Sequence, residues 1–434
     1  MHGPLDPVMY DTARQPESWW CASAPDWADP PAFDGDTRTD VAIIGGGYAG
    51  LSCARRLAEH GIEATVLEAG RIGWGASGRN GGIVGMSSHK AKDTSLIRRH
   101  GDAEVARMYA LQRDHVSLLR AFCVEAGVPI QGDGELILAH SAKAFAALRT
   151  ESAAEGVTHE IVAPDDTGDM RRFGGILIRP GFGVHPLRLV RALADAAMAE
   201  GQHVFPETEV LHWHREGPVH LLETSGGTVR ADRVVVATNG FTPDGLHPRM
   251  NGRAVPVISN IGVTRVLTPE ERARHAWLAD DPVADTKNLL VYLRMLPEER
   301  LLFGMRGDLR GSASGAAKMR GHLIRRIGEQ FPGWAGIELE HFWRGPICAT
   351  ARYTPSVGGL ADDPTVFHAF GWHGSGVNGA QVGGRMLADV IAGAPEDTIP
   401  APYRGLAPRL PLPGLRPVYV GLALMQQRLA DTFS

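Results

Sequence analysis

Three glycines and one carboxylate stand at spacings that suit the binding of a nucleotide. Gly45, Gly47 and Gly50 follow an apolar run that begins at Val41, and Glu68 stands at the end of a second apolar run. In a Gly-x-Gly-x-x-Gly turn, the missing Cβ atoms allow a tight turn, a close pyrophosphate and close helix packing. A carboxylate at this distance accepts hydrogen bonds from the adenosine ribose hydroxyls and would repel a 2′-phosphate. The pattern therefore indicates a dinucleotide cofactor.

A strand, a helix and a second strand are needed to place these residues, and the sequence predicts all three. Residues 41–44 and 64–67 are short apolar runs typical of strands buried on both faces. Between them, apolar residues recur at helical spacing from Ala49 to His60, and Gly61 supplies a C-terminal cap. The N-terminus of such a helix directs free N–H groups and the positive end of its dipole at a pyrophosphate. The spacing alone does not separate NAD from FAD.

The connection after the second strand is longer and richer in glycine than a simple NAD-binding fold requires. It reads Glu68-Ala-Gly-Arg-Ile-Gly-Trp-Gly-Ala-Ser-Gly-Arg-Asn-Gly-Gly82. With this string the chain resembles the D-amino-acid oxidase-like superfamily of FAD-dependent amine oxidoreductases, which includes glycine oxidases, sarcosine oxidases and γ-glutamylputrescine oxidoreductases. In that family the part matched by Gly75 to Gly82 runs beneath the flavin and its ribityl-phosphate arm. The resemblance therefore implies that the cofactor is FAD.

Further matches follow in order along nearly the whole chain. Ser18-Trp-Trp20 resembles the γ-glutamylputrescine branch most, and Gly183-Val-His-Pro-Leu187 opens a helix that Gly201 ends. Glu207-Thr-Glu-Val210 resembles the strand whose backbone meets the adenine, and Arg233-Val-Val-Val-Ala-Thr-Asn-Gly240 resembles an element near the pyrophosphate. The FAD-binding residues that the resemblance implies are Gly45, Gly47, Tyr48, Ala49, Gly50, Glu68, Ala69, Arg71, Gly75, Ala76, Ser77, Arg79, Asn80, Gly81, Gly82, Val210, Thr238, Asn239, Gly240, Gly374, Gly376, Val377 and Asn378.

A second glycine-rich turn stands near the C-terminus. Residues 365–370 read as a buried strand, Gly371-Trp-His-Gly-Ser-Gly-Val-Asn378 as the turn, and 379–391 as a helix. In the family such a turn brings a helix N-terminus to the flavin pyrimidine, where the dipole favours the negative charge that develops on reduction. Members often carry a histidine where this chain has Ser375, whereas His373 stands before Gly374 here. The resemblance therefore does not by itself place the imidazole over the flavin.

The signatures of FAD binding occur near both ends of the chain and again in the middle, which predicts two interleaved domains. A chain of 434 residues with 44% hydrophobic content can bury two cores. We expect an α/β protein: a Rossmann-like FAD-binding domain of the glutathione-reductase-like superfamily from residues 34–133, 181–254 and 343–410, and a second α+β substrate domain on a mixed or antiparallel sheet from 134–180 and 255–342. A helical segment over 93–126 should bridge them.

The tail over 411–434 predicts an amphipathic helix with Val418, Leu422, Met425 and Leu429 at helical spacing. This stripe is expected to pack on the protein or on another subunit, with a peripheral membrane contact as the alternative. Neither an export signal nor a run long enough to span a bilayer is present in the sequence. The sequence does not predict the oligomeric state.

Composition argues against several other classes of protein. The net charge of -5 and the lack of a Lys/Arg run argue against a nucleic-acid partner. The four cysteines have no paired spacing, which favours reduced thiols in a cytoplasmic protein. His212 and His214 would share one face of a strand, but no further ligands complete a zinc site, so we expect no metal and a solvated strand face.

The resemblance also implies the chemistry. N5 of the flavin accepts hydride from the carbon beside a neutral amine nitrogen, and the resulting iminium hydrolyses to a carbonyl compound. The protein then supplies orientation, electrostatics and exclusion of water. The candidate substrate-facing residues are Tyr292, Arg294, Arg306, Trp343, Arg344 and His373.

Two departures from the family limit the substrate and the electron acceptor. Ile347 stands where amino-acid-specific members place an arginine that binds the substrate carboxylate. Either another arginine replaces it, or the substrate carboxylate lies far from the reacting carbon, as in a γ-glutamylated diamine. Leu302 stands where sarcosine oxidases keep a lysine that promotes reaction with O2. The acceptor is therefore either O2 or a quinone or protein.

Three further alternatives remain open at this point. We expect non-covalent FAD, but Cys348 lies near the position through which sarcosine oxidases tether the flavin. Oxidation of a hydroxy acid on the same fold is the rival chemistry, because a fold does not fix a function. A flavoprotein subunit that only relays electrons is the third alternative.

Overall fold

The first of two domains is built on an eight-stranded sheet with a parallel centre. The computed structural model describes residues 3–87, 89–150, 154–165, 168–278 and 280–432. The parallel strands are, in order, β9 (His203–Phe205), β2 (Ala64–Leu67), β1 (Thr37–Ile44), β12 (Gly227–Val236) and β19 (Asp363–Phe370). Antiparallel partners complete it: β11 (Val219–Thr224) and β10 (Val210–Glu216) beside β12, and β18 (Ser356–Leu360) beside β19. The strands expected over 41–44, 64–67 and 365–370 lie within β1, β2 and β19.

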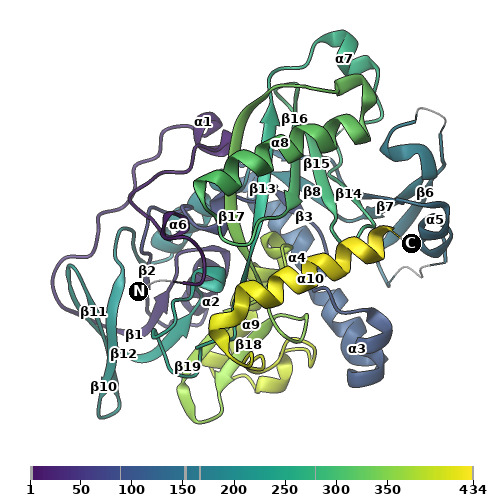
Figure 1. The fold of residues 1–434 in the computed structure, drawn as a ribbon. Helices are drawn as coiled ribbons and strands as arrows, with labels where there is room; N and C mark the ends of the chain where they lie inside the picture. Colours follow the sequence, from purple (N-terminus) through teal and green to yellow (C-terminus); the bar gives the residue numbers. More distant parts are fainter. Residues whose placement is uncertain (1–2, 88, 151–153, 166–167, 279, 433–434) are drawn as a thin grey trace.

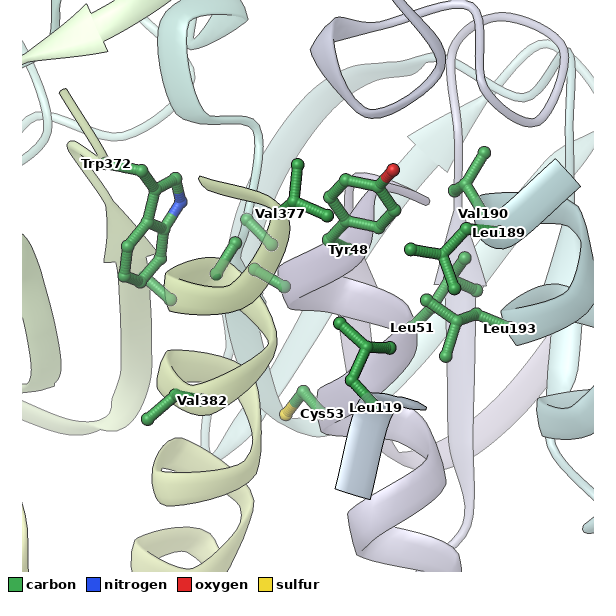
Figure 2. Close-up of a cluster of buried hydrophobic side chains, with 14 of the residues drawn as sticks. Tyr48, Leu51, Cys53, Leu119, Leu189, Val190, Leu193, Trp372, Val377 and Val382 are labelled. Atoms are coloured by element: carbon green, nitrogen blue, oxygen red, sulfur yellow. The ribbon is translucent and has the colours of Figure 1, made fainter. Parts of the chain in front are cut away.

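Three helices pack against this sheet, and a fourth packs on one of them. The three are α2 (Tyr48–Glu59), α6 (Pro186–Ala199) and α9 (Gly376–Ile391), and the fourth is α4 (Asp102–Glu125), which packs on α9. Figure 2 shows the apolar cluster between them, with Leu51 of α2 facing Val190 and Leu193 of α6. A Cβ at Gly384 of α9 would overlap the carbonyl oxygen of Ala49, so α2 and α9 are in backbone contact. This contact fixes the two helix N-termini relative to each other.

The second domain is built on a mixed eight-stranded sheet (Figure 1). Its order is β17 (Leu339–Ala349), β13 (Val255–Thr264), β16 (Arg300–Arg306), β15 (Val291–Leu296), β14 (Val283–Asp285), β5 (Glu135–Leu138), β7 (Gly175–Arg179) and β6 (Thr158–Val162). Only β14 and β5 are parallel neighbours. Helix α8 (Ala313–Gln330) packs on it through Leu323 and Ile327. The expected fold class, a Rossmann-like domain with a second domain on a mixed sheet, is confirmed.

The remaining elements connect the two domains or decorate them. A three-stranded sheet of β3 (Ile83–Val84), β8 (Phe182–Val184) and β4 (Ile130–Gln131) lies between them. The short helices are α1 (Trp19–Ser23), α5 (Ala142–Leu148) and α7 (Pro269–Ala273). The boundary expected at residue 343 falls inside β17, because Trp343 to Ala349 still pair with β13.

Two helical predictions need correction. The segment expected as one helix over 93–126 is two helices, α3 (Asp93–His100) and α4, because Gly101 adopts a φ of +86° that interrupts them. The tail does form α10 (Arg416–Thr432), which crosses the outer surface in yellow in Figure 1. Its apolar stripe does not pack on the protein: Val418, Leu422, Met425 and Leu429 are each more than half exposed, whereas Val420 on another face is buried. Packing of this stripe on another subunit stays a prediction. In the part of the chain that the structure describes, no helix is long and apolar enough to cross a membrane.

Three buried histidines and one partly buried histidine make the fold sensitive to acid. Burial lowers the pKa of His115 to about 4 and those of His185, His368 and His373 to about 3. An unfolded histidine binds its proton near pH 6.5, whereas these folded ones bind it only at lower pH. Stability is therefore fully present above pH 6.5 and is lost as the pH falls towards 3 to 4, by about 1.4 kcal/mol per histidine for each pH unit.

Replacing His368 by phenylalanine should weaken this dependence. Neither imidazole nitrogen of His368 has a hydrogen-bond partner of good geometry among the described residues, and the nearby Gly405 carbonyl also accepts Ser356 Oγ, so an apolar ring leaves no polar group unpaired. When the pH falls from 7.5 to 5.5, His368→Phe should lose about 1 to 2 kcal/mol less free energy of unfolding than the wild-type protein loses. Urea unfolding at the two pH values measures it. His212→Phe, at an exposed position, should keep the wild-type dependence, and equal losses in all three proteins would contradict the assignment.

Candidate cofactor and substrate site

A cavity opens at the carboxyl ends of the parallel strands β1, β2 and β12. Its walls include Ile44 and Leu67, which end β1 and β2, Ala237, which directly follows β12, and the turns after these strands. The expected cofactor-binding residues that line it are Gly45, Gly47, Tyr48, Ala49, Glu68, Ala69, Gly75, Ala76, Ser77, Asn80, Val210, Thr238, Asn239, Gly374, Gly376 and Val377. Segments far apart in the sequence therefore meet around one space, at the edge of the sheet where doubly wound folds bind nucleotides.

The first turn can be made only with glycine at its ends. Gly45 has a φ of +112°, and a Cβ there would lie 2.9 Å from the carbonyl oxygen of Ala237. A Cβ at Gly50 would overlap the carbonyl oxygen of Gly45. The N-cap of α2 is Gly47, which has no side chain to occupy the helix end, and the Tyr48 amide donates to Ser77 Oγ at 3.0 Å. The N-terminus of α2 is thus presented to the cavity, as a pyrophosphate requires.

Glu68 stands on the cavity wall at the end of β2. Its carboxylate accepts the Gly46 amide at 2.8 Å and the Gly70 amide at 3.0 Å. Burial raises the pKa of Glu68, and these two hydrogen bonds oppose the rise. The two oxygens retain lone pairs for further donors. The accepting carboxylate of Glu68 therefore fits the ribose hydroxyls of FAD, and the absent Cβ atoms of the turn leave room for its pyrophosphate.

The loop over residues 73–82 is held rigid by its own side chains and by distant indoles. Asn80 donates to the carbonyls of Ala76 and Ser77 and accepts the Gly82 amide. Trp20 donates to the Asn80 carbonyl, and Trp343 donates to the Arg79 carbonyl, each at 2.8 Å. These bonds tie the loop to α1 and to β17. The loop therefore links the two domains beside the cavity.

Seven of the expected cofactor-binding residues do not line this cavity: Gly50, Arg71, Arg79, Gly81, Gly82, Gly240 and Asn378. Arg71 pairs with Asp29, and Arg79 stacks on Trp74 at 4.4 Å. Asn378 donates to the carbonyls of Gly85 and Gln112 and contacts His115 Nδ1 at 2.8 Å. The side chains of Arg71, Arg79 and Asn378 are thus engaged by contacts within the protein.

The sequence reasoning missed several residues that line the cavity. Trp74, Phe241 and Trp372 stand within or next to the quoted motifs, where only the glycines and polar residues had drawn attention. Gly3, Tyr10 and Thr12 come from the N-terminal segment, which carries no motif. Local sequence patterns give no signal for this second group.

The second glycine turn places the N-terminus of α9 at the same cavity. Gly371, His373 and Gly374 have φ values of +87°, +52° and +97°. The His373 carbonyl accepts Arg306 Nη2 at 2.8 Å. Burial, helped by the charges of Arg306 and Lys90, lowers the pKa of His373 to about 3. The imidazole is therefore neutral at ordinary pH.

The other expected substrate-facing residues divide into two groups. Arg294 donates to the carbonyls of Gly81, Gly82 and Val184, and Arg344 pairs with Asp308 and donates to the Ser312 carbonyl. Both guanidinium groups are thus engaged within the protein. Tyr292 and Arg306 instead lie on neighbouring strands close to the glycine loops. The Tyr292 ring stands against Gly81 and Gly304, and its hydroxyl is 2.9 Å from Ser259 Oγ.

Comparison with known proteins identifies the family. The model of the family described as FAD dependent oxidoreductase matches residues 40–390. The chain belongs to this family. FAD is accordingly its cofactor, and the cavity described above is the place that fits it.

Relatives match over most of their length. A probable oxidoreductase OrdL of Rhizobium meliloti is 30% identical over 87% of this chain and 88% of its own. The γ-glutamylputrescine oxidoreductase of Escherichia coli is 29% identical over 94% of this chain and 96% of its own. Among solved structures, glycine oxidase from Geobacillus kaustophilus matches with a TM-score of 0.65 at 23% identity, over 82% of this chain and 94% of that one. This last likeness supports the fold.

Gly50→Ala should abolish retention of FAD. The added Cβ would overlap the Gly45 carbonyl oxygen and displace the turn that faces the pyrophosphate. We expect the flavin content, measured by absorbance at about 450 nm, to fall at least tenfold, with the circular dichroism spectrum retained. Gly321→Ala on the exposed face of α8, where a Cβ meets nothing within 4 Å, should keep its full content. A fully flavinylated Gly50→Ala protein would refute this role for the turn.

Proposed function

We propose that this flavoenzyme oxidises the C–N bond of a small amine or amino acid. When bound, FAD supplies a hydride acceptor at N5, and loss of hydride from the carbon beside a neutral nitrogen leaves an imine that hydrolyses to a carbonyl compound. The relatives support this reaction class, since one is named a γ-glutamylputrescine oxidoreductase and others are named glycine oxidases. The alternative on the same fold is oxidation of a hydroxy acid.

The assignment of the substrate rests on the contacts of Arg306. Arg294 and Arg344 are engaged with carbonyls and with Asp308, whereas Arg306 donates one hydrogen bond among the described residues, to the His373 carbonyl. Arg306 is a partly buried residue that lies beside Gly374 and Tyr292. Arg306 and Lys90 together place two positive charges near His373. We therefore propose that Arg306 attracts an anionic group of the substrate and that Tyr292 orients it.

The position of that charge favours a substrate with a remote carboxylate. Ile347 lines the cavity at the place where amino-acid-specific members carry an arginine, so the wall there is apolar. Arg306 lies on β16, a different strand of the second domain. An acylated diamine, with its carboxylate several bonds from the reacting carbon, suits this arrangement better than glycine does.

Anaerobic bleaching of the flavin tests the reaction class. We expect γ-glutamylputrescine to bleach the oxidised flavin, N-butyrylputrescine to do so only at higher concentration, and hydroxy acids to have no effect. Bleaching by hydroxy acids alone would replace the proposal with the alternative reaction. A flavin that no donor reduces would instead indicate a subunit that relays electrons.

Arg306→Gln should weaken binding of the carboxylate-bearing amine selectively. Glutamine keeps an N–H donor for the His373 carbonyl but removes the charge. Loss of a charge-assisted hydrogen bond costs about 1.5 to 3 kcal/mol, so the apparent Kd for γ-glutamylputrescine should rise roughly 10- to 100-fold. Stopped-flow reduction gives this constant, and the limiting rate should change little.

Two controls make the result specific. The apparent Kd for N-butyrylputrescine, which lacks the carboxylate, should be nearly unchanged in Arg306→Gln. Arg310→Gln, at an exposed position of the same segment, should behave as wild type. An equal rise in the apparent Kd for both amines would show that Arg306 maintains the shape of the site and does not bind the carboxylate.

We also propose that the flavin is held without a covalent bond. Cys348 lines the cavity, but burial raises the pKa of its thiol to about 12, which suppresses the nucleophilic thiolate. Acid precipitation should therefore release all the flavin into the supernatant, and the protein mass should equal that of the unmodified chain. A mass increase equal to FAD that disappears in Cys348→Ser would establish the tether instead.

The proposal for the electron acceptor rests on Leu302. Leu302, which stands in place of an oxygen-promoting lysine, is fully buried in β16. We propose a quinone or a protein as the physiological acceptor. Comparison of reoxidation of the reduced protein by O2 and by a soluble quinone would decide this, and reoxidation that is faster with O2 would favour an oxidase.

A further inference from the structure

Lys90 projects into an open space inside the protein. Its side chain is accessible, yet burial among protein atoms lowers the pKa of its ammonium to about 8. A charged group that is accessible and also surrounded by protein faces an interior space. The Lys90 amide donates to the Tyr353 carbonyl at 2.9 Å, and the Tyr353 ring stacks on that of His373, with the ring centres 6.3 Å apart. Lys90 therefore stands beside the second glycine turn.

A carboxylate of the second domain lies near Lys90. Glu135 of β5 is half-buried, and a Cβ on Gly85 would overlap its Oε2 atom. Burial raises the pKa of Glu135, and the positive charge of Lys90 opposes the rise. The two groups are thus close enough to influence each other. Within the described ranges, however, neither side chain forms a hydrogen bond or an ion pair.

The register of the second sheet puts Glu135 on the same face as Tyr292 and Arg306. One row across the sheet consists of Ile137, Ala284, Tyr292 and Gly304. Residues two positions apart on a strand share a face, so Glu135 and Arg306 both lie on the face of this row. Arg294 is on this face too, and it donates to carbonyls of the loop over residues 73–82. The face is therefore turned towards the glycine loops.

The charges in this space are not neutralised by direct partners. The pKa of Lys90 is lowered by the charge of Arg306 and raised by that of Glu135, so Lys90 is near both groups. Arg306 donates one hydrogen bond, to the His373 carbonyl, and its guanidinium has further N–H donors. Two cations and one carboxylate therefore meet around one space. Charges withdrawn from water are costly unless partners pair them, and a ligand can supply those partners.

A zwitterion would pair both signs of charge at once. The α-amino acid end of an acylated diamine carries a carboxylate and an ammonium on one carbon. We propose that Glu135 binds the ammonium of such a head group, while Lys90 and Arg306 share its carboxylate. This inference rests on the proposed oxidation of an amine with a remote carboxylate and defines the rest of that remote end. A substrate with the carboxylate alone would leave Glu135 without a cation.

Two amides that lack the amine to be oxidised isolate this subsite. γ-Glutamylbutylamide carries the whole head group, whereas N-butylglutaramate keeps the carboxylate and lacks the ammonium. Anaerobic calorimetric titration of the oxidised holoenzyme gives the Kd of each. We expect γ-glutamylbutylamide to bind roughly 10- to 100-fold more tightly, which is the contribution of one charge-assisted hydrogen bond. Equal Kd values would overturn the subsite. Bleaching of the flavin by γ-glutamylbutylamide would also overturn it, because the α-carbon would then be the reacting carbon.

Glu135→Gln should remove this preference. The Kd for γ-glutamylbutylamide should rise to that for N-butylglutaramate, and the latter should be nearly unchanged. Glu125→Gln, at the exposed end of α4, is the matched control and should keep the wild-type preference. A preference retained in Glu135→Gln would overturn the assignment of Glu135. Equal weakening of both amides would overturn it as well, since Glu135 would then only maintain the shape of the site.

Lys90→Gln should weaken both amides by a similar factor, because it removes a charge that binds the carboxylate they share. Unchanged Kd values in this variant would overturn the role of Lys90. None of these titrations requires turnover. If no amine bleaches the flavin, the proposed oxidation fails while the preference for the head group is still measured. If amines bleach the flavin and the wild-type protein shows no preference, the subsite alone fails.

Discussion

The close approach of main-chain atoms at Gly45 and Gly50 is the constraint on which the rest of the site depends. With a side chain at either position, the turn after β1 would collide with Ala237 or with its own carbonyl. A missing side chain also allows close contact at Gly384, where the backbone of α9 touches that of α2. These contacts fix the positions of the N-termini of α2 and α9. Because the positive ends of the two helix dipoles lie there, the contacts also determine where the cavity tolerates negative charge. The acid at Glu68 then completes the wall.

The two domains are joined by bonds that radiate from the loop over residues 73–82. Trp343 of the second domain and Trp20 of the N-terminal region both donate indole N–H groups to its carbonyls. Arg294 adds a buried guanidinium that bonds the carbonyls of Gly81 and Gly82. A buried cation of this kind is tolerated only when carbonyl dipoles surround it. The loop that the family places beneath the flavin is therefore also a rigid junction between the two domains.

Local patterns predicted the parts of the fold that local physics decides. The strands within β1 and β2 and the helix α2 follow from apolar periodicity and from glycine at the helix ends, and the cavity glycines follow from steric need. The pattern could not reveal that Gly101 adopts a positive φ and divides the helical segment. In the tail, the apolar stripe is present as predicted, but Arg416 directs the opposite face inward through an ion pair with the distant Asp244. Long-range partners of this kind leave no trace in spacing.

The same limit applies to the site. Arg294 and Arg344 had the right residue type for a substrate carboxylate, yet their partners, the Val184 carbonyl and Asp308, come from segments that spacing does not connect to them. Tyr10 was missed for the converse reason, because it reaches the cavity from a segment without any motif. Charge and residue type therefore indicated candidate residues for the substrate carboxylate. Only the three-dimensional contacts separated side chains that are bonded within the protein from side chains that can bind a substrate.

Calorimetric titration of the apoprotein with FAD, and separately with NAD, tests the central claim most directly. If the backbone-lined cavity is built for the flavin dinucleotide, one FAD binds per chain and NAD produces no saturable heat. Saturable binding of NAD together with no binding of FAD would contradict the account.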